Sequence, residues 1–326
     1  MILVTGSAGH LGEALMRLLR AAGVPARGLD LKPSPYTDIV GSICDRALVG
    51  EAMEGVTGVL HSATLHKPHV VTHSQQDFLD TNVSGTLALL EEAARRGVGA
   101  FVYTSTTSAF GSALTPAASD PAAWITEAVT PIPRNIYGTT KLAAEQLCEM
   151  YGRRRGLPVV ILRTSRFFPE EDDNAGARSR FSLDNLQLLE LLYRRADIAD
   201  IADAHLKALD RAPALGFARY IVSATTPFTR DDLADLHLDA GAVIRRRFPQ
   251  STDLFARRGW NFPPVIDRVY VNALARAELD WVPVRDFAHG LDCLARGVDF
   301  RSELARTVGS KGYHDEVFEH GPYPVE

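Results

Sequence analysis

The stretch TGSAGHLG, residues 5–12, follows an apolar run that starts at Ile2 and leads into a helical pattern. It places Gly6, Gly9 and Gly12 at three-residue spacing. A strand that turns sharply into a helix through such glycines presents backbone N–H groups to a phosphate at the N-terminus of the helix. Side chains at these positions would block the pyrophosphate or the contact between helix and sheet. The stretch therefore predicts the first βα unit of a dinucleotide-binding α/β fold.

Beyond this stretch, short apolar runs alternate with helical patterns through the first two thirds of the chain, which is typical of a parallel α/β sheet. Helices are expected over residues 10–23, 84–97 and 138–156, each pattern ending at a glycine. The expected strands are Ile2–Thr5, Ala26–Asp30, Ile39–Cys44, Gly58–His61, Ala100–Ser105 and Val159–Arg163.

The alternation ends near residue 165, where PEEDDNAGARSR (169–180) has the composition of a loop. Shorter helices are expected at Leu183–Tyr193, Ile201–Leu209 and Asp231–Leu238, and a strand at Arg219–Ser223. We predict a doubly wound Rossmann sheet in residues 1–165. Residues 166–326 should form a smaller, mixed C-terminal substrate-binding region, from which a segment at about 219–223 returns to the sheet.

The 326 residues have the composition of an ordinary globular protein, with 46% hydrophobic and 23% charged residues. A net charge of −5 without a long basic cluster argues against nucleic-acid binding, and no apolar run reaches membrane-spanning length. Cys44, Cys148 and Cys293 are far apart, so neither a disulfide framework nor a zinc site is expected. The strand-like start MILVTG leaves no room for a signal peptide. We therefore expect a reducing, cytoplasmic environment.

Two carboxylates follow predicted strands near the glycine turn. Asp30 stands 18 residues after Gly12, where a carboxylate accepts hydrogen bonds from both ribose hydroxyls and repels a 2′-phosphate. This favours NAD over NADP as the cofactor, although Lys32 lies close by. Asp45 follows the third predicted strand, where it either contacts the adenine amino group, or caps the next helix, or does both.

The stretch IYGTTK (136–141) places Tyr137 four residues before Lys141, so that both share one face of a helix. A hydride leaves a carbinol carbon only as the hydroxyl proton is removed, which requires a base beside the nicotinamide. Free tyrosine, with a pKa near 10, is too weak a base at neutral pH, and a nearby ammonium group lowers that pKa. The pair is therefore a candidate for proton transfer, whereas in isolation it would be an ordinary surface pattern.

Seven sequence blocks occur in the order known from one enzyme family. Together they resemble the extended short-chain dehydrogenase/reductases, the NAD-dependent epimerase/dehydratase family. The blocks are VTGSAGHLG (4–12), VLHSAT (59–64), TNVSGTLALLEEA (81–93), FVYTSTTSAFG (101–111), IYGTTKLAAE (136–145), DIADAH (200–205) and AELDWVP (277–283).

The resemblance implies site residues and an assembly. It assigns the cofactor site to Gly6, Gly9, His10, Leu11, Gly12, Asp30, Asp45, Ala63, Asn82, Tyr137 and Lys141. It makes Thr106, Tyr137 and Lys141 the catalytic residues, with Ser105 as the alternative to Thr106 for holding the substrate oxygen. It also implies a homodimer that packs through the helices at 84–97 and 136–152.

The chain departs from the family's dehydratases directly after Thr106. The family's dehydratases carry an Asp-Glu pair there, whereas this chain has Thr107 and Ser108, neither of which can act as the acid that expels water. Of the reactions that the resemblance implies, dehydrogenation and epimerisation remain. Only 33 residues separate Arg166 from Asp200, which is short for a nucleotide-binding segment and favours a smaller substrate, unless residues 226–270 supply the nucleotide contacts.

The expected substrate contacts are Thr107, Arg166 and His66. Arg166 either binds a carboxylate or phosphate of the substrate, or forms an ion pair with Glu170, Glu171 or Asp172. The histidines of LHKPHVVTH (65–73) either line the pocket or face solvent, and no metal is expected at His66, His69 and His73.

These features favour an NAD-dependent oxidoreductase or epimerase that transfers hydride at a secondary alcohol of a sugar-like substrate: a sugar, a sugar acid or a nucleotide sugar. The alternatives are a simple dehydrogenase or reductase of a small non-sugar carbonyl or lactone, and a regulatory protein that binds NAD without turnover.

Overall fold

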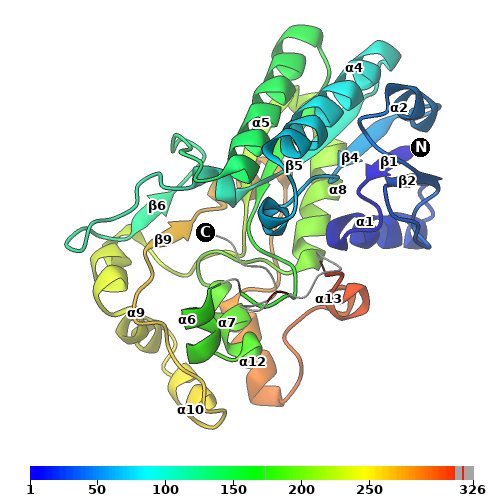
Figure 1. Ribbon diagram of the computed structural model, residues 1–326. Helices are drawn as coiled ribbons and strands as arrows, with labels where there is room; N and C mark the ends of the chain where they lie inside the picture. Colours follow the sequence, from blue (N-terminus) through cyan, green and yellow to red (C-terminus); the bar gives the residue numbers. More distant parts are fainter. Residues whose placement is uncertain (173, 313–317, 319–326) are drawn as a thin grey trace.

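The computed structural model describes residues 1–172, 174–312 and 318. Its centre is a seven-stranded sheet in which every neighbouring pair of strands is parallel (Figure 1). In spatial order the strands are β3 (Ile39–Val40), β2 (Ala26–Asp30), β1 (Ile2–Thr5), β4 (Gly58–His61), β5 (Ala100–Thr106), β7 (Val159–Thr164) and β8 (Phe217–Val222). The chain runs outward from β1 in both directions, so the order reverses between β1 and β4. In such sheets ligands bind outside the carboxyl ends of the strands at this reversal.

Helices cover both faces of the sheet because successive strand residues point to opposite sides. One face, which includes Val4, packs against α1 (His10–Ala21), α8 (Ile198–Leu215) and α13 (Glu303–Val308). The other, which includes Leu3, packs against α2 (Arg46–Ala52), α4 (Thr86–Arg96) and α5 (Ile136–Arg155). This arrangement confirms the predicted doubly wound α/β fold.

A third hydrophobic cluster lies beyond the carboxyl ends of the strands, in the lower half of Figure 1. It is built by α7 (Leu183–Glu190), α9 (Leu233–Arg247), α10 (Ser251–Ala256) and α12 (Phe287–Arg296). Beside it, β6 (Ala123–Ile125) pairs in parallel with β9 (Arg268–Tyr270). The remaining elements are η1 (Lys67–Val71), α3 (Gln75–Phe78), the π-helical turn η2 (Leu79–Gly85), η3 (Thr107–Phe110), α6 (Ala175–Arg180), η4 (Arg230–Asp232) and α11 (Ala273–Leu279).

Several expected boundaries were wrong. The third strand ends at Val40 instead of Cys44: Gly41 N–H still donates to Asp30 O of β2 (2.8 Å), and the chain then turns into α2. The helix expected at Ile201–Leu209 is the longer α8, which begins after its N-cap Asp197. The helix expected at Asp231–Leu238 begins as η4 and continues as α9 to Arg247. The β6–β9 pair was not predicted.

In the part of the chain that the structure describes, the helices are too short or too polar to cross a membrane.

Candidate active site

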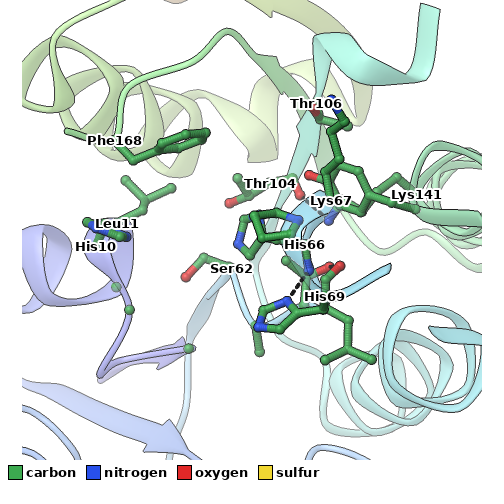
Figure 2. A pocket seen from close by; sticks show the side chains of 18 of the residues that line it. His10, Leu11, Ser62, His66, Lys67, His69, Thr104, Thr106, Lys141 and Phe168 are labelled. Atoms are coloured by element: carbon green, nitrogen blue, oxygen red, sulfur yellow. Dashed lines mark hydrogen bonds between the residues drawn. The ribbon is translucent and has the colours of Figure 1, made fainter. Parts of the chain in front are cut away.

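A cavity of about 850 Å³ opens at the carboxyl ends of β1, β2, β4, β5 and β7 (Figure 2). Most of the predicted site residues line it: Gly6, Gly9, His10, Leu11, Gly12, Asp30, Ala63, His66, Thr106, Thr107, Tyr137, Lys141 and Arg166. Asp45 and Asn82 are not among the lining residues. The sheet thus brings residues as far apart in the sequence as Gly6 and Arg166 to the same cavity.

The backbone of the glycine turn packs so closely at Gly6 and Gly12 that a side chain would not fit at either position. Gly6 has φ +73°, and a Cβ atom there would lie 2.7 Å from the backbone nitrogen of Ala63. A Cβ atom at Gly12 would lie 1.9 Å from the carbonyl oxygen of Gly6. Gly9 caps α1 without a side-chain hydrogen bond, so the first N–H groups of the helix face the cavity without a competing side chain. These features fit the pyrophosphate of a dinucleotide.

We predict that Gly12→Ala weakens NAD binding at least about tenfold, because the turn must move to relieve the contact between the new Cβ atom and the Gly6 carbonyl. Calorimetric titration with NAD measures this. Gly50→Ala is the matched control: it lies inside α2, where the added Cβ would meet no described atom outside its own helix closer than Glu92 Oε1 at 3.9 Å. Equal NAD affinity in the two folded variants would contradict the assignment of this turn.

The two carboxylates near the adenosine end differ in position. Asp30 Oδ2 accepts a hydrogen bond from Ala8 N (2.9 Å) and Oδ1 accepts one from Lys32 N (2.8 Å), which holds the carboxylate at the cavity. Asp45 caps α2 by accepting from the N–H groups of Ala47 and Leu48. The helix-cap interpretation therefore holds for Asp45, and the expected adenine contact finds no support in the cavity wall.

Asn82 supports the site from behind. It is buried in the π-helical turn η2, and its Oδ1 accepts hydrogen bonds from the hydroxyl of Thr64 and from Leu65 N, each 2.8 Å long. Its Nδ2 donates to Thr140 Oγ1 (3.1 Å) on α5. Asn82 thereby joins the loop after β4, which includes Ala63, to the helix that carries Tyr137.

Thr106, Tyr137 and Lys141 all line the cavity. Tyr137 lies in the first turn of α5, whose N-cap Asn135 accepts a hydrogen bond from Gly138 N. Lys141 Nζ donates to Thr104 O (2.6 Å). Figure 2 shows Thr106, Lys141 and His66 on one side of the cavity, with His10 and Leu11 on the other.

Burial controls the protonation of both residues of the pair. It raises the pKa of Tyr137 to about 12, and a hydrogen bond from Thr106 offsets part of this rise. It lowers the pKa of Lys141 to about 7, and the carboxylate of Glu145 acts in the opposite direction. In the protein chain by itself the pKa of Tyr137 is thus raised, and the expected lowering by Lys141 in the complete site stays a prediction. The hydroxyl of Thr106 is the side chain that favours the phenolate.

Ser105 and Thr106 have different surroundings. Ser105 donates its hydroxyl to the buried carboxylate of Glu145 (2.5 Å). The Thr106 oxygen accepts from Ser108 N (3.0 Å) and lies within hydrogen-bond reach of Tyr137. Of the two, Thr106 is the better placed to meet a substrate oxygen.

The histidine loop after β4 forms one wall of the cavity, which His66, His69 and His73 all line. The ring centroid of His66 lies 5.8 Å from that of Tyr137, and its backbone N–H donates to His69 Nδ1 (2.8 Å; Figure 2). Burial lowers the pKa of His66 to about 3, so this ring is neutral at physiological pH. Within the described ranges, no group of three or more His, Cys, Asp or Glu side chains is arranged to hold a metal ion.

Arg166 lines the cavity and forms an ion pair, as one of the two interpretations expected. Its partner is Asp172, and Glu190 Oε1 lies 3.5 Å away. Glu170 instead pairs with His10 at 2.7 Å.

Sequence reasoning missed several residues of the cavity wall, among them Arg194, Tyr270 and Lys311. The backbone N–H of Lys311 donates to Glu170 Oε1 (3.0 Å), which brings the end of the described chain to the glycine turn. No local pattern marks Lys311, because its contacts come from residues more than 100 positions away.

Comparison with known proteins agrees with this geometry. Residues 2–216 match the family model described as NAD dependent epimerase/dehydratase family. The chain is 31% identical over 353 aligned positions to a UDP-glucose 4-epimerase of Azospirillum brasilense, covering 95% of this chain and 94% of that protein. It is 29% identical over 340 positions to a dTDP-glucose 4,6-dehydratase of Streptomyces antibioticus, covering 92% and 91%. Several other curated relatives are matched over only 39% to 55% of their length.

Among solved structures, a short-chain dehydrogenase/reductase superfamily protein of Agrobacterium tumefaciens with bound NAD superposes with a TM-score of 0.64 and 25% identity, covering 91% of this chain and 96% of that one. The fold and the cavity define the class of protein, a dinucleotide-binding α/β protein of the short-chain dehydrogenase/reductase superfamily. More closely, the chain belongs to the NAD dependent epimerase/dehydratase family. The family and the NAD cofactor expected from the sequence are confirmed.

Proposed function

We propose that this protein is an NAD-dependent oxidoreductase or epimerase that acts at a secondary alcohol of a sugar-like substrate. The observation that carries the proposal is that Thr106, Tyr137 and Lys141 line the same cavity as the glycine turn and Asp30. A proton acceptor and a dinucleotide site thus share one volume. A regulator that only bound NAD would not need the proton acceptor.

In this mechanism the Thr106 hydroxyl hydrogen-bonds the substrate oxygen and orients it. Tyr137, as its phenolate, takes up the hydroxyl proton as the carbon–hydrogen bond is broken, and NAD, when bound at the glycine turn and Asp30, would supply the hydride acceptor. Lys141 is held by Thr104 O beside this proton transfer, and its protonated form, which a pKa of about 7 leaves partly populated at neutral pH, favours the phenolate. His66, neutral and close to Tyr137, and Thr107 line the volume in which the rest of the substrate would lie.

Two features favour simple oxidation or epimerisation over dehydration. Thr107 and Ser108 follow Thr106, and Asp30 is the sole acidic side chain among the described residues that line the cavity. Asp30 is at the adenosine end, so no lining carboxylic acid is available to expel water. Sites for one ligand typically measure about 300–1,000 Å³. A cavity of about 850 Å³ that also holds NAD therefore favours a small substrate.

The test is to incubate the enzyme with NAD and neutral, acidic and phosphorylated monosaccharides. Accumulation of NADH, followed by its absorbance, identifies a dehydrogenase, and an inverted stereocentre without net NADH, followed by NMR, identifies an epimerase. Turnover of small carbonyls or lactones alone would favour the alternative reductase and would contradict the sugar-like assignment.

We also propose a homodimer through α4 and α5, which lie side by side (Figure 1). A monomer in light-scattering measurements on the NAD-bound protein would contradict it.

A further inference from the structure

The ammonium group of Lys141 contacts two neighbouring residues of β5. Its Nζ donates to the carbonyl oxygen of Thr104 (2.6 Å) and lies over the ring of Tyr103, 4.2 Å from the ring centroid. An ammonium group over the face of an aromatic ring, within about 6 Å of the centroid, is attracted by the negative potential of that face. Lys141 is 2% exposed and Tyr103 is 1% exposed, so water screens this attraction little.

The hydroxyl of Tyr103 does not explain why a tyrosine is here. Among the described residues it is buried and has no hydrogen-bond partner. Burial of an unpaired hydroxyl is unfavourable. Burial also raises the pKa of Tyr103 well above its ordinary value, so the phenol stays neutral. The contribution of Tyr103 to the site therefore comes from the face of its ring.

A buried histidine packs against this ring and is itself fixed. The ring centroid of His61 lies 5.4 Å from that of Tyr103. Thr86 Oγ1 donates to Asn82 O (2.8 Å) and therefore accepts from His61 Nε2–H (2.9 Å). His61 Nδ1 then accepts from the hydroxyl of Thr5 (2.7 Å). With both nitrogens bonded, the imidazole cannot rotate without losing a hydrogen bond, and it supports the Tyr103 ring in one place.

Most of the titratable groups around Lys141 are neutral at pH 7. Burial lowers the pKa of His61 and of His66 to about 3, and it raises the pKa of Tyr137 to about 12. Burial also raises the pKa of the Cys148 thiol. None of these four groups therefore supplies a negative charge that would stabilise the ammonium form.

Glu145 is the charged group among the described neighbours that act on Lys141. Its carboxylate already pairs with Arg163 Nη2 at 2.7 Å and lies 3.1 Å from Arg219 Nε. Two guanidinium groups thus offset much of its attraction for Lys141. The Tyr103 ring, by contrast, favours the ammonium form without a competing cation in the described contacts.

The ionisation of Lys141 is sensitive to such a contact. Burial lowers the pKa of Lys141 to about 7, so the ammonium and amine forms are both populated at neutral pH. A change of one unit in this pKa therefore changes the ammonium population several-fold. The resulting charge matters for the proposed reaction, because an ammonium group favours a nearby phenolate.

We propose that Tyr103 is a positioning residue whose ring face holds the Lys141 ammonium group in place and keeps it protonated, which favours the phenolate of Tyr137. The effect on the phenolate rests on the proposed hydride transfer. The contact between ring and ammonium group can be measured without turnover, so the two can fail separately.

The first test replaces Tyr103 with phenylalanine and then with phenylalanines that carry one, two, three and five fluorines. Fluorine withdraws electron density from the ring face with little change of shape. The chain has five lysines, so protein labelled with ¹³C at the lysine Cε gives few NMR signals, and Lys141→Arg assigns the one of interest. We expect Tyr103→Phe to keep the pKa of Lys141, and the fluorinated series to lower it stepwise by about one unit in total.

The same series at Phe101 is the matched control. Phe101 lies on the same strand, is fully buried, and packs against His61 with 5.9 Å between the ring centroids. Fluorines there should leave the titration of Lys141 unchanged. A constant pKa of Lys141 across the folded Tyr103 series would overturn the role of the ring and leave the proposed function intact.

The second test measures kcat/KM of the NAD-saturated enzyme with its best sugar. The ratio of the pentafluorinated variant to Tyr103→Phe should be near one at pH 5.5 and fall about fivefold at pH 7, because a pKa one unit lower leaves about a fifth of the ammonium form. A stepwise fall of the pKa with an unchanged ratio would overturn the effect on the phenolate. If no sugar is turned over, the proposed function is wrong, and the NMR series alone decides whether the ring holds the ammonium group.

Discussion

Replacing Tyr137 with phenylalanine is expected to lower turnover about 10²- to 10⁴-fold while NAD still binds, because general base catalysis contributes a factor of that size. The ring of Tyr137 is buried and packs near His66, and phenylalanine keeps this packing. The substitution therefore removes the proton acceptor without opening a cavity. Steady-state rates with the best sugar, together with NAD affinity by calorimetry, measure the effect.

Tyr151→Phe is the matched control, since Tyr151 is also buried on α5 but does not line the cavity. It should keep full activity. The pH dependence gives a second readout: with a pKa near 12 the phenolate is scarce at neutral pH, so kcat/KM for alcohol oxidation should rise as pH increases from 6 to 9, about tenfold per unit at most. Full activity of Tyr137→Phe would exclude Tyr137 as the base, and a wild-type protein that binds NAD but turns over nothing would favour the regulatory alternative.

The central sheet could be predicted because parallel α/β units are periodic over short distances. Ile2–Thr5, Ala26–Asp30 and Gly58–His61 have the bounds that were expected, since each lies next to a turn or helix signal. β6 and β9 escaped prediction because each has three residues, and the partner of Ala123 is Arg268, far along the chain. Pairing of that kind depends on the packing of the folded chain and leaves no local pattern.

The site could be predicted in part for the same reason. Thr106 is the last residue of β5, and the order of the strands in the sheet places the end of this strand at the cavity. The pKa of Tyr137 could not be predicted, because its direction depends on burial and on where Lys141 Nζ points. The partner of Arg166 also depends on the tertiary structure: three nearby acids were considered, and the described network adds Glu190 from a distant helix.

The largest stability loss is expected at Glu145, one turn beyond Lys141 on α5. Its carboxylate is fully buried, pairs with Arg163 through Nη2 at 2.7 Å and Nε at 3.0 Å, and accepts the Ser105 hydroxyl. Arg219 Nε lies 3.1 Å away. Glu145→Ala would leave the buried guanidinium of Arg163 without this carboxylate. Breaking a buried pair by removing one partner typically costs about 3–5 kcal/mol.

Glu149→Ala, one turn further along the same helix, is the comparison that separates burial from helix propensity. Glu149 also pairs with two arginines, Arg153 at 2.7 Å and Arg219 at 2.9 Å, but its side chain is 28% exposed. Water screens such pairs, so its loss should cost about 0–1 kcal/mol. Urea unfolding of both variants gives the two free energies. Similar losses would mean that burial of the Glu145–Arg163 pair contributes little to stability, and that the network behind Lys141 tolerates an unpaired charge.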